Sequence, residues 1–277
     1  MIIDLIKYDL KYIFKTVMVF AILLLLSAIL HNVTSYGYTP TILDANGDVT
    51  GGDPDAPTII LFLHTLFYNA IYCFATGLLV NSCMRVWQRF KSSMYGDEAY
   101  LTHTLPLSRS TLWASKFLSI LITAFSTVLI LALTCFILNL TDGGKYLIGG
   151  IGISSDWPLN NLVYTSIVFT QLIFIMVSGV SGIILANRIK SCKPHPILYG
   201  FGFYILGSCL ILVVSKLLQY INPDFQALFG HTFDPYSTYT VSFITRILTT
   251  ISLFYTAIIA ALYIIDRKLL RRGINLD

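Results

Sequence analysis

Apolar residues gather in six long runs, and the short stretches between them hold nearly all of the charge. A helix that crosses a bilayer core of about 30 Å needs about 20 apolar residues, and each run is close to that length. We therefore expect an all-α integral membrane protein with six transmembrane helices, in which residues 1–277 form a single transmembrane domain. The predicted spans are Ile13–Leu30, Ile59–Met84, Phe117–Leu140, Leu162–Asn187, Ile197–Ser215 and Val241–Ile265.

The positions of lysine and arginine predict the orientation of these spans. If the N-terminus is cytoplasmic, all of the 18 basic residues fall on the cytoplasmic side except Lys145, Lys216 and Arg246. Because cytoplasmic loops of membrane proteins are enriched in lysine and arginine, this arrangement is favoured over its inverse. We expect both termini in the cytoplasm, and we expect the Gly/Pro/Asp-rich outer loop Tyr36–Thr58 to be irregular.

The first fifteen residues are amphipathic. Asp4, Lys7, Lys11 and Lys15 follow one another at steps of three or four and so share one helix face, whereas the other side is apolar. This pattern predicts an interfacial helix on the inner membrane surface ahead of the first span. The alternative is a continuous extension of the first span.

Composition excludes several classes of protein. The chain is 56% hydrophobic and only 12% charged, and its net charge of +4 has no clustered basic face, so we expect membrane lipids and no nucleic acid as partners. The five cysteines show no CxxC pair, and no two of the five histidines are three or four residues apart. We therefore expect neither a disulfide framework nor a metal site.

One sizeable cytoplasmic segment, residues 85–116, separates the second and third spans. Pro106 interrupts any helix near its position, and Ser108 is a good N-cap, so we expect a short helix, a break and a second helix that enters the third span.

The charges of this segment suggest two roles. Arg85, Arg89 and Lys91 at its start are expected to lie at anionic lipid head groups. Asp97 and Glu98, the latter the only glutamate of the chain, are expected to present a negative patch. A short charged helix of this kind suits docking to a soluble partner, whereas the alternative is an ordinary solvated loop.

Residues 94–108 read MYGDEAYLTHTLPLS, and this segment resembles the inner loop of the permease subunits of type-2 ABC exporters. In that family a Gly-Asp-Glu and a Thr-x-Thr-Leu-Pro-x-Ser pattern form the coupling helix that contacts the ATPase subunit. Ala99 departs from the family pattern, where a glycine is expected. The resemblance implies that the ATPase contact is shaped by Gly96, Asp97, Glu98, Tyr100, Leu101, Leu105 and Pro106.

The resemblance also implies a function. The chain would be the permease subunit of a bacterial exporter in the cell membrane, paired with a second permease chain as a homodimer and with two copies of a cytoplasmic ATP-binding subunit. No cofactor is expected in this chain, because it lacks a GxxxxGK[ST] motif and ATP and Mg²⁺ would bind the partner ATPase. We expect no catalytic residue and hence no enzyme activity in this chain.

Neutral polar residues inside the spans bear on the cargo. Asn69 and Gln171 lie deepest and could line a substrate path, although hydrogen bonding between helices is the alternative use. A neutral lining suits an amphipathic peptide or a lipophilic compound better than an ion.

Three other functions remain open. One is a secondary transporter or channel, although the predicted spans contain no carboxylate for a proton relay. Another is a non-transporting sensor or scaffold of a peptide-resistance system. The third is an intramembrane hydrolase that uses Ser181 of the Gly179–Gly182 segment, whereas Ser178, Gly182 and Ala186 at steps of four indicate helix packing there.

Overall fold

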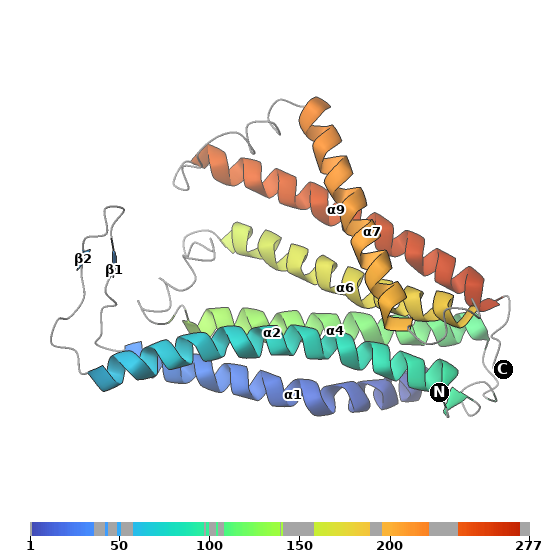
Figure 1. Cartoon of the computed structure of the whole chain (residues 1–277), viewed down its shortest axis with the longest axis horizontal. Helices are drawn as coiled ribbons and strands as arrows, with labels where there is room; N and C mark the ends of the chain where they lie inside the picture. Colours follow the sequence, from blue (N-terminus) through green and yellow to red (C-terminus); the bar gives the residue numbers. More distant parts are fainter. Residues whose placement is uncertain are drawn as a thin grey trace. The chain divides into compact units, whose positions relative to one another are not determined.

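The apolar runs fold into six long α-helices, shown along the chain in Figure 1. The computed structural model describes residues 2–35, 42–43, 49–50, 58–96, 98–99, 104, 108–138, 140, 158–188, 196–221 and 238–271. The helices are α1 (Ile2–Ser35), α2 (Thr58–Tyr95), α4 (Arg109–Leu138), α6 (Pro158–Arg188), α7 (Pro196–Ile221) and α9 (Thr238–Arg271). The protein is a multi-pass helical membrane protein, as its composition predicts.

Five of the helices are long and apolar enough to cross a membrane: α1, α2, α4, α6 and α9. In α7 the apolar stretch among the described side chains is shorter, Gly200–Val213. The all-α class is therefore confirmed, five of the helices are candidate membrane spans, and the crossing of the membrane by α7 stays a prediction. Two helices start at a proline, Pro158 of α6 and Pro196 of α7, which suits a first helical position because no intrahelical partner is lost there.

Two helices are longer than their predicted spans. α1 is continuous from Ile2 to Ser35, so the amphipathic first residues continue into the first span, as in the alternative interpretation, and no separate interfacial helix is seen. α2 continues past Met84 to Tyr95 because no glycine or proline occurs between Met84 and Gly96. Part of the segment predicted to hold a short helix is therefore the end of α2, and beyond α2 the residues Ala99 and Thr104 are helical. At the start of α4, Ser108 caps the helix as predicted: its Oγ accepts from the Thr111 amide at 3.2 Å.

The loop after α1 contains one element that was not expected. Strands β1 (Ile42–Leu43) and β2 (Val49–Thr50) pair in antiparallel register, with Ile42 opposite Thr50. The prediction of an irregular loop is wrong for these residues. A sequence signal for it is Asn46-Gly47, a turn-forming dipeptide between the apolar pair Ile42–Leu43 and the β-branched pair Val49–Thr50.

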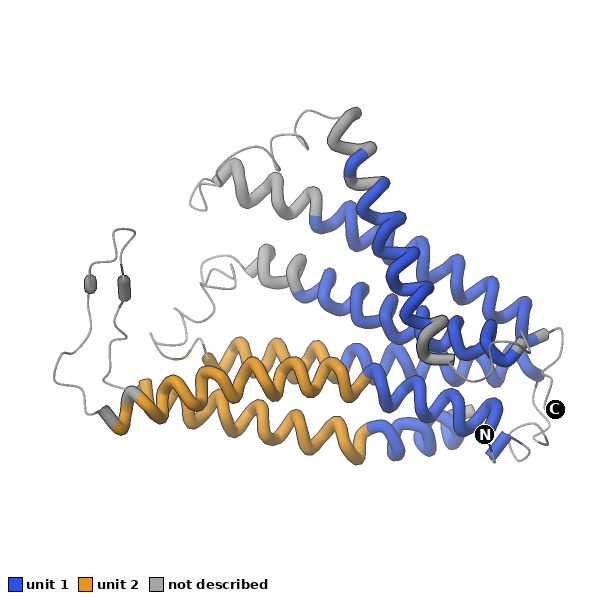
Figure 2. Tube along the Cα trace, viewed as in Figure 1, with its two compact units in different colours: residues 1–13, 83–125, 163–277 blue, residues 14–82, 126–162 orange. Residues whose placement is uncertain are grey.

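The chain forms two compact units, coloured separately in Figure 2. Unit 1 comprises residues 1–13, 83–125 and 163–277, and unit 2 comprises residues 14–82 and 126–162. In unit 2, parts of α1, α2 and α4 lie side by side, and Phe20 of α1 packs directly on Gly77 of α2. In unit 1, α6 is the most buried of the spans.

The centre of unit 1 is the ring of Phe174 on α6. It lies 5.8 Å from Tyr204 of α7 and 5.2 Å from Tyr255 of α9, measured between ring centroids. About two turns further along α9, Tyr263 stacks on Trp113 of α4, with ring centroids 5.9 Å apart. Residues near the start of α4 contact both α1 and the C-terminal half of α9, through Lys116 with Asp9 and Trp113 with Tyr263.

Candidate functional site

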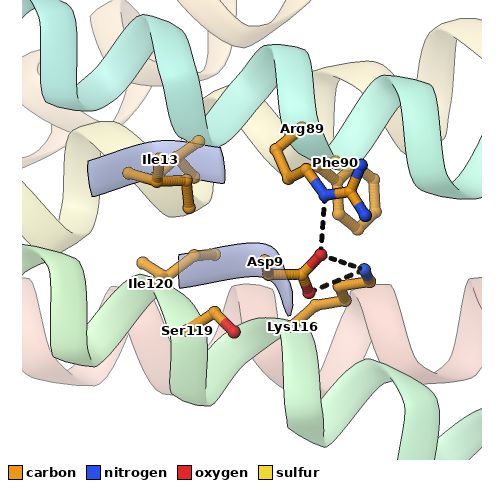
Figure 3. A pocket seen from close by; sticks show the side chains of 8 residues that line it. Asp9, Ile13, Arg89, Phe90, Lys116, Ser119 and Ile120 are labelled. Carbon is orange, nitrogen blue, oxygen red and sulfur yellow. Dashed lines mark hydrogen bonds and ion pairs between the residues drawn. The ribbon is translucent and has the colours of Figure 1, made fainter. Parts of the chain in front are cut away.

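Four charged side chains meet at the end of unit 1 where α1 begins, and we call them the charge cluster: Asp9, Arg89, Glu98 and Lys116. Asp9 lies at its centre on α1, with 1% of the residue exposed. Its carboxylate accepts hydrogen bonds from Arg89 Nε at 2.8 Å and from Lys116 Nζ at 2.7 and 3.0 Å (Figure 3). One carboxylate thus holds a cation from α2 and a cation from α4.

Arg89 extends the cluster to the loop after α2. Its Nη1 donates to Glu98 Oε2 at 2.6 Å, so the guanidinium bridges two carboxylates. The rings of Tyr8 and Tyr12 cover the guanidinium, with centroids 4.7 and 5.4 Å from Cζ. Such cation–π contacts favour a cation that has left water. Two positive and two negative groups leave the cluster neutral, which a buried group of charges requires.

A small cavity adjoins the cluster and is lined on its apolar side by Ile13, Phe90 and Ile120 (Figure 3). Its volume is about 20 Å³, enough for about one water molecule. This space is too small for an organic substrate. The cluster is therefore an internal joint between helices, and its chemistry is electrostatic.

These contacts correct one expectation from the sequence. Arg89 was placed at lipid head groups, but only 5% of it is exposed and both of its partners are carboxylates of this chain. One carboxylate oxygen of Glu98 forms an ion pair with Arg89, so the charge of the predicted negative patch is in part neutralised within the protein. Lys91 and Arg85 remain more accessible, at the surface and half-buried respectively.

Of the predicted coupling residues, the structure describes two, Gly96 and Glu98. Gly96 follows the last turn of α2, and its amide donates to the Ser92 carbonyl at 3.2 Å. A Cβ at this position would lie 2.9 Å from that carbonyl oxygen, so the close approach requires glycine. The other predicted residues lie outside the described part: Asp97, Tyr100, Leu101, Leu105 and Pro106.

The two residues predicted to line a path are in different units. Asn69 is exposed on α2 in unit 2, and its amide donates to the Thr65 carbonyl at 2.8 Å. Gln171 is half-buried on α6 in unit 1. Their role in a path stays a prediction.

A second buried carboxylate, Asp266 of α9, was not singled out from the sequence. Its Oδ2 lies 2.7 Å from Ser181 Oγ, and Ser181 also contacts the Val177 carbonyl at 3.0 Å. Asp266 Oδ1 has no hydrogen-bond partner among the described residues. The described residues of unit 1 include no histidine, so Ser181 lacks there the imidazole base that a serine hydrolase uses.

Two histidines that are far apart in sequence meet in unit 2. His31 of α1 and His64 of α2 have ring centroids 4.4 Å apart, and Ser35 Oγ lies 3.2 Å from His64 Nδ1. No group of three or more metal-ligating side chains occurs within the described residues. Sequence spacing could not find this pair, because the pairing is between helices.

The missed residue with the clearest sequence signal is Asp9. It lies at steps of three and four between Ile6 and Ile13, on the apolar side of α1 and away from the lysine stripe. A single carboxylate on an apolar helix face indicates a buried ion pair, because burying it alone would be too costly.

Comparisons of this chain with protein families, with curated proteins and with solved structures find no match.

Proposed function

We propose that this chain is the transmembrane permease subunit of an ATP-driven ABC exporter, in which the loop around Gly96 and Glu98 receives the motion of a separate ATPase. The charge cluster is the observation that carries the proposal. Through Arg89 and Asp9 it joins the loop residue Glu98 to α1, α2 and α4. A displacement of the loop would thereby pull on three helices at once.

Three of the four charges are buried, Asp9, Arg89 and Lys116, whereas the side chain of Glu98 is 40% exposed. Removing one partner from a buried ion pair costs about 3–5 kcal/mol, because the remaining charge has no water to solvate it. The helices α1, α2 and α4 are therefore expected to stay joined at Asp9, and the half-exposed Arg89–Glu98 pair ties the loop to them with a smaller contribution to stability. An ordinary solvated loop would not need such an anchor, since exposed ion pairs contribute only about 0–1 kcal/mol.

The rest of the proposal follows the family that the loop resembles. Two ATP-binding subunits, each holding ATP and Mg²⁺, would act on two copies of this chain. The cargo would be an amphipathic peptide or a lipophilic compound, moved out of the cell across its cytoplasmic membrane. The chain itself has no GxxxxGK[ST] motif, so it needs such a partner for ATP hydrolysis.

The test is the paired change Asp97→Ala and Glu98→Ala, made in the complex that the chain forms in its native membrane. We expect ATP-dependent export and ATP hydrolysis by the partner to fall together, with the protein still inserted at its normal level. Lys91→Ala is the matched control, because Lys91 is an exposed charge at the same helix end. Unchanged export in the double variant, or the lack of any ATP-hydrolysing subunit in the complex, would contradict the proposal.

Asp266 favours a second candidate, a proton-coupled secondary transporter. Buried carboxylates within membrane helices mark proton relays and ion sites, and Asp266 has one oxygen without a partner among the described residues. Under this alternative, export persists without ATP, follows a pH gradient, and is lost in Asp266→Asn. Under the permease proposal, depletion of ATP stops export even when a gradient is present.

A further inference from the structure

Helix α2 differs from the other spans of this protein. Among the five candidate membrane spans it is the least apolar and the least buried within the chain. A helix that is both polar and uncovered is costly in a bilayer, because hydrocarbon offers no hydrogen bonds. Something other than lipid is therefore expected to cover part of α2.

The exposed polar side chains of α2 in unit 2 share one face, which we call the polar stripe: Thr65, Tyr68, Asn69, Tyr72 and Thr76. Steps of three and four place them in one row. The two tyrosines are 37% and 40% exposed, and their hydroxyls lie 3.4 Å apart. With a rise of 1.5 Å per residue the stripe extends over about 16 Å, roughly half of a bilayer core.

The chemistry of the stripe points to a partner without charge. The described residues of unit 2 contain a single charged side chain, Lys15, in the half of α1 remote from His31. Hydroxyl and amide groups supply both donors and acceptors, so the stripe is complementary to itself. A two-fold axis brings the same patch of two copies together, which makes self-complementarity the requirement for a dimer.

The extent of the stripe favours a contact over a water-filled path along α2. One and two turns beyond Thr76, the same face carries Leu79 and Cys83, and Cys83 is 7% exposed. The polar side chains therefore end at Thr76 and do not line a continuous path along the whole of α2. Polar side chains between membrane helices, in contrast, stabilise helix association over short stretches.

We propose that the polar stripe of α2 is the contact surface between two copies of this chain. Asn69 and Tyr72, in the middle of the row, lie closest to the two-fold axis. Tyrosine and asparagine side chains from both copies hydrogen-bond across it and are shielded from lipid. The contact does not depend on the chain being an exporter.

Cysteine cross-linking tests this surface in membranes. All five native cysteines are replaced by serine, and single cysteines are introduced as Asn69→Cys, Tyr72→Cys and Thr76→Cys. Leu63→Cys is the control, because Leu63 is 36% exposed on the opposite side of the same helix. Copies with two different tags are expressed together and oxidised, and a disulfide-linked pair carrying both tags identifies a second copy as the partner.

We expect Asn69→Cys or Tyr72→Cys to yield about tenfold more linked dimer than Leu63→Cys, because a disulfide forms only when the two Cα atoms are within about 7 Å. Equal yields at Leu63 would overturn the proposal. The absence of linked dimer at all three stripe positions would also overturn it. In that case, thiols that react with a water-soluble maleimide would indicate a water-filled path, and unreactive thiols would indicate lipid or another protein. ATP-dependent export, measured on the same variants, keeps this result separate from the proposed function.

Discussion

At the scale of single residues, the charge cluster shows how one carboxylate organises an end of the protein. Asp9 could have been recognised from its place between Ile6 and Ile13 on the apolar face of α1. Its partners could not, because Arg89 and Lys116 are 80 and 107 residues away and both resemble ordinary cytoplasmic basic residues in the sequence. Local patterns reveal that a partner is needed but not which one.

Asp9→Ala should lower the free energy of unfolding by about 3–5 kcal/mol, because the two buried cations Arg89 and Lys116 are then left with Glu98 as the single carboxylate of the cluster. The additional change Lys116→Met should recover part of the loss by restoring neutrality. Denaturant unfolding in detergent micelles measures both. Lys11→Ala on the exposed face of α1 is the control and should change the free energy by less than about 0.5 kcal/mol. An Asp9→Ala effect no larger than that of Lys11→Ala would show that the cluster does not hold the helices.

At the scale of secondary structure, the sequence predicted the helices well and their ends less well. The apolar runs locate each of the six long helices that the structure describes, because a bilayer requires long apolar segments whatever the packing. They do not locate where a helix stops in water, which depends on breakers and caps. Ser108 was recognised as a cap, whereas the continuation of α2 to Tyr95 was missed because its last turns are polar.

Packing between helices is also invisible in a single sequence, and the crossing of α6 and α7 is an example. A Cβ on Gly200 would lie 2.5 Å from the Cα of Gly179, so the two backbones touch there. A Cβ on Gly179 would in turn lie 2.0 Å from the indole of Trp87, whose Nε1 donates to the Met176 carbonyl at 3.0 Å. Small residues allow this approach of membrane helices.

Gly200→Ala should therefore destabilise the protein by about 1–3 kcal/mol, because the backbone of α6 must move away. Gly202→Ala is a matched control on the same helix, since nothing lies within 4 Å of a Cβ at that position. Thermal unfolding of the two variants in the same detergent separates crowding from helix propensity. Equal melting temperatures would mean that α6 and α7 do not cross as closely as the structure indicates.

At the scale of the whole molecule, membrane spans follow from hydropathy, but orientation and the sixth crossing do not follow from the structure. They rest on the distribution of lysine and arginine and on the length of the α7 helix. The side of the membrane that each chain end faces is a prediction from charge alone.

Reporter fusions test that orientation. Alkaline phosphatase fused after Asp277 should be inactive and green fluorescent protein fused there should be fluorescent, because the phosphatase needs the oxidising exterior for its disulfides. Phosphatase fused after Asn222, between α7 and α9, should be active. An active C-terminal fusion together with an inactive fusion after Asn222 would contradict the predicted topology, and inactivity at both positions would mean that neither α7 nor α9 crosses the membrane.

The charge cluster also constrains how the protein is made. Asp9 leaves the ribosome first, and Lys116 follows 107 residues later. At about 5–20 residues per second, α1 waits about 5–20 s for the second of its two cations. During biosynthesis the first helix therefore carries an unneutralised carboxylate, and it can settle into its final place only after α2 and α4 have been synthesised. The assembly of α1 with α2 and α4 in the membrane therefore cannot be completed before Lys116 has been synthesised.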